Sequence, residues 1–239
     1  MSQTFFRFKE FTVHQVDCAM KVCTEACLFG AWVASLLPEM GATENMLDIG
    51  AGTGLLSLLL AQKSEAQIDA IEIDEDAAMQ AADNFGHSPW GERLTLLPGD
   101  ARQFDVEKKY GLIISNPPFF ENDLKSPDAK RNLALHNDAL TLEDLATVVQ
   151  RCIAPGGYFA VLLPPERTAQ LESLTGEYGW QLMYKTAVRQ TPAHSAFRYM
   201  LIFSGAPKMV EANEIIIREE NGNYTEAFTA LLKDYYLYL

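Results

Sequence analysis

No stretch of this 239-residue sequence is apolar over the length that a membrane-spanning helix needs. The first residues, Met1 to Arg7, also lack the apolar core of a secretory signal peptide. These two absences lead us to expect a cytoplasmic protein that does not interact with membranes.

Basic residues are also scarce, because 19 lysines and arginines stand against 32 acidic residues, for a net charge of −13. Phosphate contacts depend on Lys and Arg, so this balance argues against a nonspecific nucleic-acid binder. Two local basic islands remain, one between Trp180 and Met209 and one after position 120. They are compatible either with an RNA-binding face or with ordinary solvated edges. The first island contains Lys185, Arg189, His194, Arg198 and Lys208, and the second contains Lys125, Lys130, Arg131 and His136.

The four cysteines show no C-x-x-C spacing, and we expect small core residues rather than metal ligands at Cys18, Cys23, Cys27 and Cys152. The sequence has no internal repeat, and its 48% hydrophobic and 21% charged residues fit a globular α/β protein with a substantial core. We predict an N-terminal lid hairpin and helix at 1–40, one ligand-binding domain at 41–239, and a monomer without metal.

A glycine-rich turn follows a short apolar segment that predicts a strand at 45–49. Its glycines, at positions 50, 52 and 54, precede an amphipathic helix predicted from Leu55 to about Gln62. Glycines permit a tight turn and let the backbone approach a ligand closely. The spacing G-x-G-x-G differs from the G-x-G-x-x-G of dinucleotide-binding proteins, which leaves a dehydrogenase as the weaker interpretation.

Acidic residues accompany this turn. Asp48 precedes the first glycine by two places, and Glu72 lies near the end of a second strand predicted at 67–74. Doubly wound folds place a ribose-binding carboxylate about 20 residues after the glycine turn, which is the position of Glu72. An ionised carboxylate only accepts hydrogen bonds, so it can bind both ribose hydroxyls. Asp74 either joins this site or caps a helix that begins near Glu75.

A third predicted strand, at 93–97, ends in a Gly-Asp turn at Gly99 and Asp100. Such turns are common, so this one alone indicates little. Its position in a series of motifs, each at the carboxyl end of a strand, favours a ligand-binding role.

The fourth strand carries the most informative motif, Asn116-Pro117-Pro118-Phe119, directly after the apolar run 111–114. Two prolines cannot donate the hydrogen bonds of a sheet, so the strand ends there. The side-chain carbonyl of Asn116 and the backbone carbonyl of Pro117 can both accept hydrogen bonds from one flat amino group, while Phe119 stacks on its ring. The alternative is a plain Pro-Pro turn that ends a core strand.

The other patterns complete an alternating α/β order. We predict a hairpin within 5–11, helices at 16–37, 140–153, 166–176 and 225–236, a long polar loop at 121–139, strands at 158–163, 181–190 and 197–203, and an edge strand at 215–217.

The glycine turn with Asp48, the Gly-Asp turn and the Asn116 motif together resemble class I S-adenosylmethionine-dependent methyltransferases. The Asn-Pro-Pro-Phe quartet resembles the signature of enzymes that methylate amino groups. Within them the chain is similar to the small bacterial enzymes that methylate N6 of the adenine beside the anticodon of valine tRNA, adenine 37. This similarity lies in residues 11–13, 21–26, 48–54, 116–119, 130–136, 224–226 and 234–236.

The resemblance implies a Rossmann-like, doubly wound, mostly parallel sheet of seven strands with a reversed last strand. It implies S-adenosylmethionine as cofactor and tRNA as substrate. It assigns catalysis to Asn116, Pro117, Pro118 and Phe119, and cofactor binding to Lys21, Thr24, Asp48, Gly50, Ala51, Gly52, Gly54, Glu72, Asp74, Asp100, Ala101 and Asn116. With the basic islands it assigns RNA binding to Lys130, Arg131, His136, Arg189 and Arg198.

Cys23 and Glu25 stand where that family more often has Gly and Asp, which bears on the contact of Lys21 and Thr24 with the methionyl end of the cofactor. Three alternatives stay open. The same quartet occurs in protein glutamine methyltransferases and fits a ribosomal guanine-N2 methyltransferase. A noncatalytic module that binds the cofactor and RNA belongs to another class.

Overall fold

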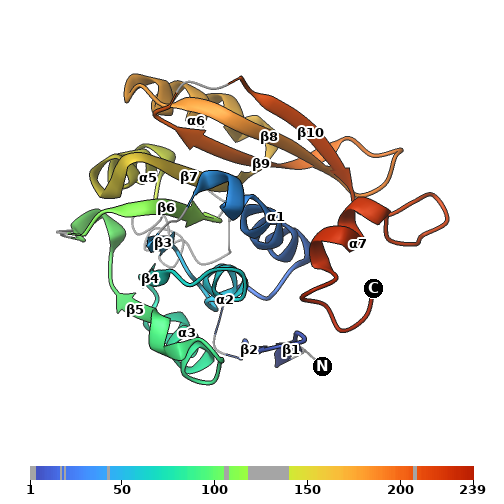
Figure 1. Ribbon diagram of the computed structural model, residues 1–239, viewed down its shortest axis with the longest axis horizontal. Helices are drawn as coiled ribbons and strands as arrows, with labels where there is room; N and C mark the ends of the chain where they lie inside the picture. The colour runs from blue at the N-terminus through green and yellow to red at the C-terminus, as the bar shows by residue number, and fades with distance from the viewer. Residues whose placement is uncertain are drawn as a thin grey trace, which may run out of the picture.

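The computed structural model describes residues 4–16, 18, 20–41, 44–104, 108–117, 140–206 and 209–239. Eight of its strands form one sheet in the order β10-β8-β9-β7-β6-β3-β4-β5 (Figure 1). The strands of this sheet are β3 (Asn45–Ile49), β4 (Gln67–Glu72), β5 (Leu94–Pro98), β6 (Tyr110–Ser115), β7 (Ile153–Leu163), β8 (Gln181–Arg189), β9 (Ala196–Ser204) and β10 (Glu211–Ile216).

All neighbouring strands are parallel except β9, which is antiparallel to both β7 and β8. The seven strands from β5 to β8 therefore form the predicted mostly parallel sheet with its last strand, β9, reversed. The eighth strand, β10, adds to the edge of β8 where the run 215–217 predicts an edge strand. The predicted fold class is confirmed.

Helices cover both faces of the sheet. They are α1 (Thr24–Met40), α2 (Leu55–Ala61), α3 (Glu75–Gly86), α5 (Leu142–Cys152), α6 (Pro165–Glu177) and α7 (Glu226–Leu232), with short 3-10 turns η1 (Gly91–Arg93) and η2 (Ala101–Gln103). One hydrophobic cluster joins α1, α2 and α7 to one face, and a second joins α5 and α6 to the other. The helix predicted from Leu55 to about Gln62 is present as α2, but it is not amphipathic as predicted, because every residue of its sequence LLSLLLA is buried.

The predicted helix at 16–37 begins later, at Thr24, and continues through Pro38 to Met40. The segment before it is engaged otherwise: the backbone N–H groups of His14 and Val16 are bonded to Asn84 and Gln80 of α3, and that of Val22 is bonded to the side chain of Gln15. These contacts hold residues 14–16 in an extended course. Proline in the last turn removes a single intrahelical hydrogen bond, and the helix tolerates it there.

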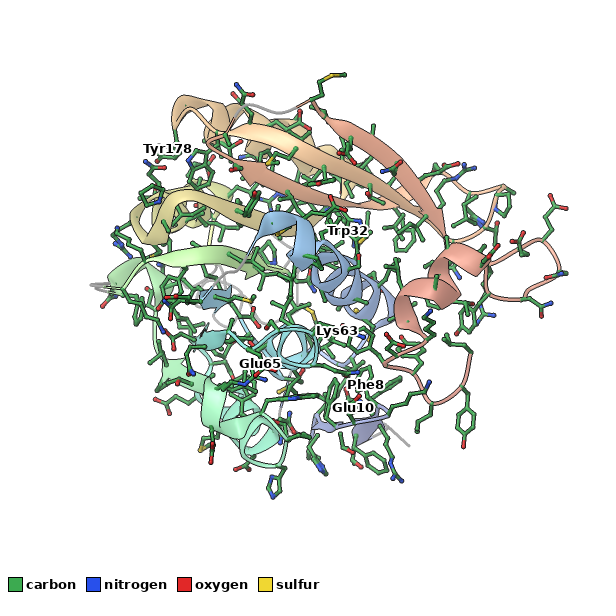
Figure 2. All side chains as sticks on the ribbon, in the orientation of Figure 1. Phe8, Glu10, Trp32, Lys63, Glu65 and Tyr178 are labelled. Carbon is green, nitrogen blue, oxygen red and sulfur yellow. The ribbon has the colours of Figure 1, made fainter. Side chains whose placement is uncertain are left out.

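The N-terminal hairpin consists of β1 (Phe5–Arg7) and β2 (Thr12–His14), which pair antiparallel. Its turn buries Phe8 and Phe11 in the same hydrophobic cluster as α1 and α2. Phe8 also forms an isolated β-bridge with Tyr236, so the two ends of the described chain lie side by side (Figures 1 and 2). No helix in the described part of the chain is long and apolar enough to span a bilayer.

Candidate active site

The register of the sheet gathers the sequence motifs at one edge. Ile49 of β3 pairs with Ile71 of β4 on one side and with Ser115 of β6 on the other. The next residues, Gly50, Glu72 and Asn116, therefore lie at the carboxyl ends of three neighbouring strands. Glu72 in turn pairs with Pro98, which brings the Gly99–Asp100 turn to the same edge. Open α/β sheets bind ligands at this edge.

The glycine turn is held by backbone contacts and leaves its outer side open. The N–H groups of Gly50 and Ala51 both donate to the carbonyl of Ile71, at 2.9 and 3.1 Å. Gly50 and Gly52 have φ values of 76° and 54°, which favour glycine, and a Cβ on either would meet no atom within 4 Å. Open space at such positions is where a ligand can contact the backbone.

The third glycine serves packing instead. Gly54 has a φ of 78°, and a Cβ there would collide with the ring of Phe85 in α3. It therefore lets the start of α2 lie directly against α3.

Glu72 spans the glycine turn and the start of α3. Its two carboxylate oxygens accept from the N–H groups of Gly52 at 2.7 Å and Asp74 at 3.0 Å. These bonds fix the carboxylate beside the glycine turn, and the predicted ribose contact of Glu72 stays a prediction. Asp74 accepts from the Ala77 N–H at 2.8 Å, which confirms it as the cap of α3. Its role in cofactor binding stays a prediction.

Asp48 is completely buried in β3, under the glycine turn. Its Oδ2 accepts from the Ser57 hydroxyl at 2.8 Å, whereas its Oδ1 has no hydrogen-bond partner among the described residues. Burial raises the pKa of the Asp48 carboxyl to about 7, against the opposing effect of Ser57, and the nearby charge of Glu72 raises it further.

Asn116, like Asp48, has a side-chain oxygen without a hydrogen-bond partner among the residues that the structure describes. Its Oδ1 is buried and has no hydrogen-bond partner in the described part of the chain. An acceptor left in this state costs about 1–3 kcal/mol, so the fold leaves at this edge an acceptor able to take a donor from outside. Pro117 is buried beside it, and Ser115 is held to the Ile49 carbonyl at 2.8 Å. Pro118 and Phe119 lie outside the described residues.

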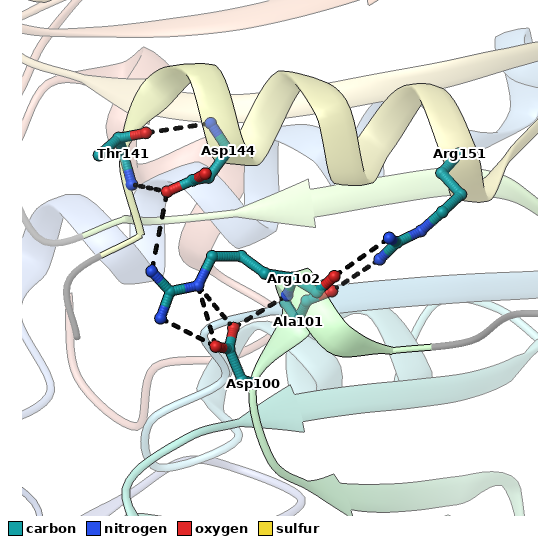
Figure 3. A network of polar contacts seen from close by, with 6 residues as sticks. All are labelled: Asp100, Ala101, Arg102, Thr141, Asp144 and Arg151. Atoms are coloured by element: carbon teal, nitrogen blue, oxygen red, sulfur yellow. Dashed lines mark hydrogen bonds and ion pairs between the residues drawn. The ribbon is translucent and has the colours of Figure 1, made fainter. Parts of the chain in front are cut away.

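Asp100 is the centre of a network that joins η2 to α5 (Figure 3). Its carboxylate accepts from the backbone N–H of Arg102 at 2.9 Å and from the Arg102 guanidinium at 2.8–3.0 Å. The hydrogen bonds from Arg102 are the main cause that lowers the pKa of the Asp100 carboxyl. The predicted partner Ala101 is buried, and its carbonyl accepts from Arg151 of α5 at 2.9 Å.

Lys21 and Thr24 lie where α1 begins. The Lys21 ammonium donates to the backbone carbonyls of Gln15 and Val16. Thr24 is the first residue of α1, and the preceding Cys23 makes no capping hydrogen bond with its side chain. An ion pair of 3.7 Å between Glu25 and Arg198 joins this end of α1 to the start of β9.

Arg189 and Arg198, predicted to bind RNA, lie at the same edge of the sheet as Asn116. Arg189 ends β8, and Arg198 precedes Tyr199, the partner of the last residue of β7. Both are paired with acids, Arg198 with Glu25 and Arg189 with Glu214 at 3.0 Å. The other three predicted RNA contacts, Lys130, Arg131 and His136, lie outside the described residues.

Three polar residues that the sequence motifs do not indicate support this edge. Ser57 binds Asp48, Arg102 binds Asp100, and Asn84 joins the glycine turn to β2. The Asn84 amide accepts from the His14 N–H and donates to the carbonyls of His14 and Thr53, at 2.8–2.9 Å. Only the position of Arg102, two residues after Asp100, is a signal visible in the sequence.

Two hollows of about 480 and 340 Å³ lie at the opposite edge, where β3, β6 and β7 begin, and Pro155, Gly156 and Gly157 line both. Among the described residues, no group of three His, Cys, Asp or Glu side chains is arranged to hold a metal ion.

Comparison with known proteins agrees with this arrangement. The model of the methyltransferase small domain family matches residues 30–151. A tRNA1(Val) (adenine(37)-N6)-methyltransferase of Dyadobacter fermentans is 40% identical over 237 residues, 97% of each chain. The enzyme with the same name from Parabacteroides distasonis is 38% identical over 240 residues, 99% of each chain.

Among solved structures, that of a predicted O-methyltransferase from Agrobacterium tumefaciens superimposes with a TM-score of 0.64 at 18% identity. It covers 87% of this chain and 95% of its own. This likeness supports the fold. The family match and the full-length relatives settle the class of enzyme. The chain belongs to the methyltransferase small domain family, as a class I methyltransferase that uses S-adenosylmethionine.

Proposed function

We propose that this enzyme transfers a methyl group to N6 of an adenine in tRNA, with adenine 37 of valine tRNA as the preferred nucleotide. Two relatives that are 38–40% identical over nearly their full length carry this activity in their names. The described carboxyl edge supplies groups for both the cofactor and the amine.

The residues at this edge fit S-adenosylmethionine. Gly50 and Gly52 leave open space beside the backbone, and Glu72 presents an oriented carboxylate for the ribose hydroxyls. Asp100 is an ionised acceptor for an adenine amine. Lys21 and Thr24 stand at an α1 N-terminus whose partial positive charge suits a carboxylate. The cofactor supplies a sulfonium methyl group that an amine can attack.

The single observation that carries the proposal is the buried, unpartnered Oδ1 of Asn116 at the end of β6. An adenine amine is a poor nucleophile because its lone pair is delocalised into the ring. When Asn116 Oδ1 and the Pro117 carbonyl accept its two N–H bonds, they hold the amine and favour the pyramidal form that attacks. Acceptors fixed in advance where positive charge develops are worth about 3 kcal/mol of barrier each. The methylated amine then loses its extra proton.

Binding of the base requires that it leave its stack, and Phe119 is the aromatic side chain that the motif offers to receive it. Arg189 and Arg198 at the same edge, with Lys130, Arg131 and His136, are the proposed contacts to the RNA backbone. We place this activity in the cytoplasm, where tRNA is found, and propose a monomer.

The test is Asn116→Ala, with Asn45→Ala as the matched control. Asn45 is an asparagine at the opposite, amino end of β3. We expect Asn116→Ala to lower turnover about 100-fold or more, while binding of S-adenosylhomocysteine stays within about twofold. Asn45→Ala should change neither. Unchanged turnover in Asn116→Ala would remove the residue from the mechanism.

The substrate is identified in the same assay by incubating the protein with labelled cofactor and total tRNA, ribosomal RNA or a protein extract. Label in N6-methyladenosine of valine tRNA is the expected result. Label in guanosine of ribosomal RNA or in a glutamine side chain would instead select one of the two rival enzymes. No transfer to any of them would favour a noncatalytic binding module.

A further inference from the structure

The η2 turn that carries Asp100 and Ala101 is contacted by both the first and the last turn of helix α5 (Figure 3). In the last turn of α5, Arg151 donates to the carbonyls of Arg102 and Ala101, at 3.1 and 2.9 Å. In the first turn, Asp144 lies 3.9 Å from the other side of the Arg102 guanidinium. The two contacts are about two turns of helix apart.

Asp144 is itself fixed. It forms a capping box with Thr141, in which Asp144 N–H donates to the Thr141 hydroxyl at 3.0 Å and Thr141 N–H donates to the Asp144 carboxylate at 3.2 Å. The carboxylate that faces Arg102 therefore belongs to the most ordered part of the helix start.

Arg102 is the link between this helix and the proposed adenine site. Its Nε lies 3.0 and 2.9 Å from the two oxygens of Asp100, and its Nη2 lies 2.8 Å from Oδ2. A planar guanidinium that bonds both oxygens fixes the rotation of the carboxylate, which a lysine ammonium cannot do as strictly. The Asp100 side chain keeps 15% of its surface exposed, so a ligand can still reach it.

From these contacts we infer that Arg102 is a positioning residue for the cofactor: braced by Asp144 and Arg151 of α5, it orients Asp100 to accept the adenine amine and so sets the preference for adenine. The inference rests on the proposed function, in which Asp100 receives that amine. Arg102 also lowers the pKa of Asp100, which keeps it an acceptor that cannot donate.

The oriented Asp100 carboxylate should therefore distinguish adenine from hypoxanthine. Adenine presents an amine that donates to Asp100. Hypoxanthine presents an oxygen that faces the ionised carboxylate without a hydrogen bond. We expect the wild-type enzyme to bind S-adenosylhomocysteine at least about tenfold more tightly than its hypoxanthine analogue, since hydrogen bonds to charged groups are worth about 1.5–3 kcal/mol.

The test measures the dissociation constants of both compounds for Arg102→Met by titration calorimetry. We expect affinity for S-adenosylhomocysteine to fall about tenfold and the preference over the hypoxanthine analogue to shrink to about threefold or less. KM for S-adenosylmethionine should rise in proportion, while kcat stays within about twofold. Arg102→Lys should keep more of the preference for adenine than Arg102→Met does, because lysine retains the positive charge but not the planar pair of donors.

Lys185→Met is the matched control. Lys185 pairs with Glu172 at 2.8 Å, with side chains 32% and 36% exposed, so this variant also removes an exposed ion pair, but one between β8 and α6. It should leave both affinities unchanged. If Arg102→Met retains the wild-type preference and KM, the inference is overturned. Should Arg102→Met fail to fold, the same affinities are measured for Arg151→Met. This variant removes the two hydrogen bonds from α5 to the η2 backbone and leaves the contacts of the Asp100 carboxylate in place.

A second variant, Asp100→Leu, separates this inference from the proposed function. It removes the acceptor altogether, whereas asparagine would keep one. If Asp100→Leu binds S-adenosylhomocysteine as tightly as the wild type, the assignment of Asp100 to the adenine is wrong and the inference falls with it. If Asp100→Leu weakens binding while Arg102→Met does not, only the positioning role of Arg102 is overturned.

Discussion

Asp48 and Asp69 are buried carboxylates on neighbouring strands of the same sheet, and their surroundings differ. Asp69 lies toward the amino end of β4, where it accepts from the Tyr110 hydroxyl at 2.7 Å and pairs with Lys108 at 2.8 Å. Asp48 lies near the carboxyl end of β3, where Ser57 binds one of its oxygens and the other has no partner among the described residues.

The contrast extends to the two edges of the sheet. Together with Asp48, the acceptor of Asn116 is buried and incomplete near the carboxyl edge. Asp69, whose register partner is the residue before Asp48, instead accepts two hydrogen bonds at its Oδ2, from Tyr110 at the start of β6 and from Lys108 just before it. Polar groups with all their partners stabilise the fold, and incomplete ones store a cost that a ligand can relieve. Two of the unpartnered acceptors in the described part of the chain, Asp48 Oδ1 and Asn116 Oδ1, lie near the carboxyl edge, whereas a third, Gln62 Oε1, lies at the far end of α2. Both hollows lie at the opposite edge of the sheet.

The largest expected effect comes from Asp48→Asn, measured as free energy of unfolding against pH. Asp48 has a folded pKa of about 7, above its ordinary value of 3.8, so folding takes up a proton between these values. Its contribution to stability is complete below pH 4 and is lost as the pH rises through 7. The variant lacks this loss, and its stability relative to the wild type should rise by on the order of 3 kcal/mol from pH 4 to pH 8. Parallel stability curves would mean that the pKa of Asp48 is not raised by folding.

Asp69→Ala tests the other half of the comparison. It leaves the buried Tyr110 hydroxyl without its acceptor, which should lower the free energy of unfolding by about 2 kcal/mol in urea titrations. The half-exposed Lys108 adds little to this loss. We expect kcat and KM of the folded enzyme to match the wild type, and a specific loss of cofactor binding would contradict the division between the two edges.

Glu72→Gln sharpens the role of the carboxyl edge. The Glu72 carboxylate accepts from the N–H groups of Gly52 and Asp74. In the variant the amide NH2 replaces one of these acceptor oxygens, so one backbone N–H faces another donor. We expect affinity for S-adenosylhomocysteine to fall about tenfold in calorimetry. The control is Glu44→Gln, at a glutamate that lines the smaller hollow at the amino edge. An equal loss in both variants would remove the distinction between the edges.

The smallest effect is expected for Arg189→Met, because Glu214 already neutralises much of the charge of Arg189. Affinity for tRNA should fall about two- to threefold at low salt, with a shallower dependence on salt. Lys185→Met is again the control, as an ion-paired cation within the same strand. Gel-shift titrations at two salt concentrations measure both. A tenfold loss for Lys185→Met would place the RNA on another surface.

The sequence predicts the order of strands and helices well, because buried strands in a parallel sheet are continuous apolar runs and their ends carry glycine or proline. Asp74 as a helix cap and the edge strand near 215 are predicted for similarly local reasons. The start of α1 is not predicted from the sequence. The side-chain amides of Asn84 and Gln80, some 65–70 residues away, hold residues 14–16 extended.

The candidate site divides in the same way. Gly50, Glu72, Asp100 and Asn116 are predicted from motifs at strand ends, and the register brings all of them to one edge. Arg151 escapes prediction because its partners are backbone carbonyls, which leave no pattern in the sequence. Arg102 is indicated only by its place two residues after Asp100. The unpartnered oxygen of Asp48 is likewise a property of packing, which no spacing of residues encodes.

The β-bridge between Phe8 and Tyr236 has a consequence for the order of folding. The Lys9 N–H in the turn of the hairpin donates to the backbone carbonyl of Tyr235, more than 200 residues later in the chain. Closing so long a loop is entropically costly and gains its contacts only at the end. The packing of β1 and β2 is therefore complete only once residues 235 and 236 are in place, so this part of the fold depends on a contact of very long range.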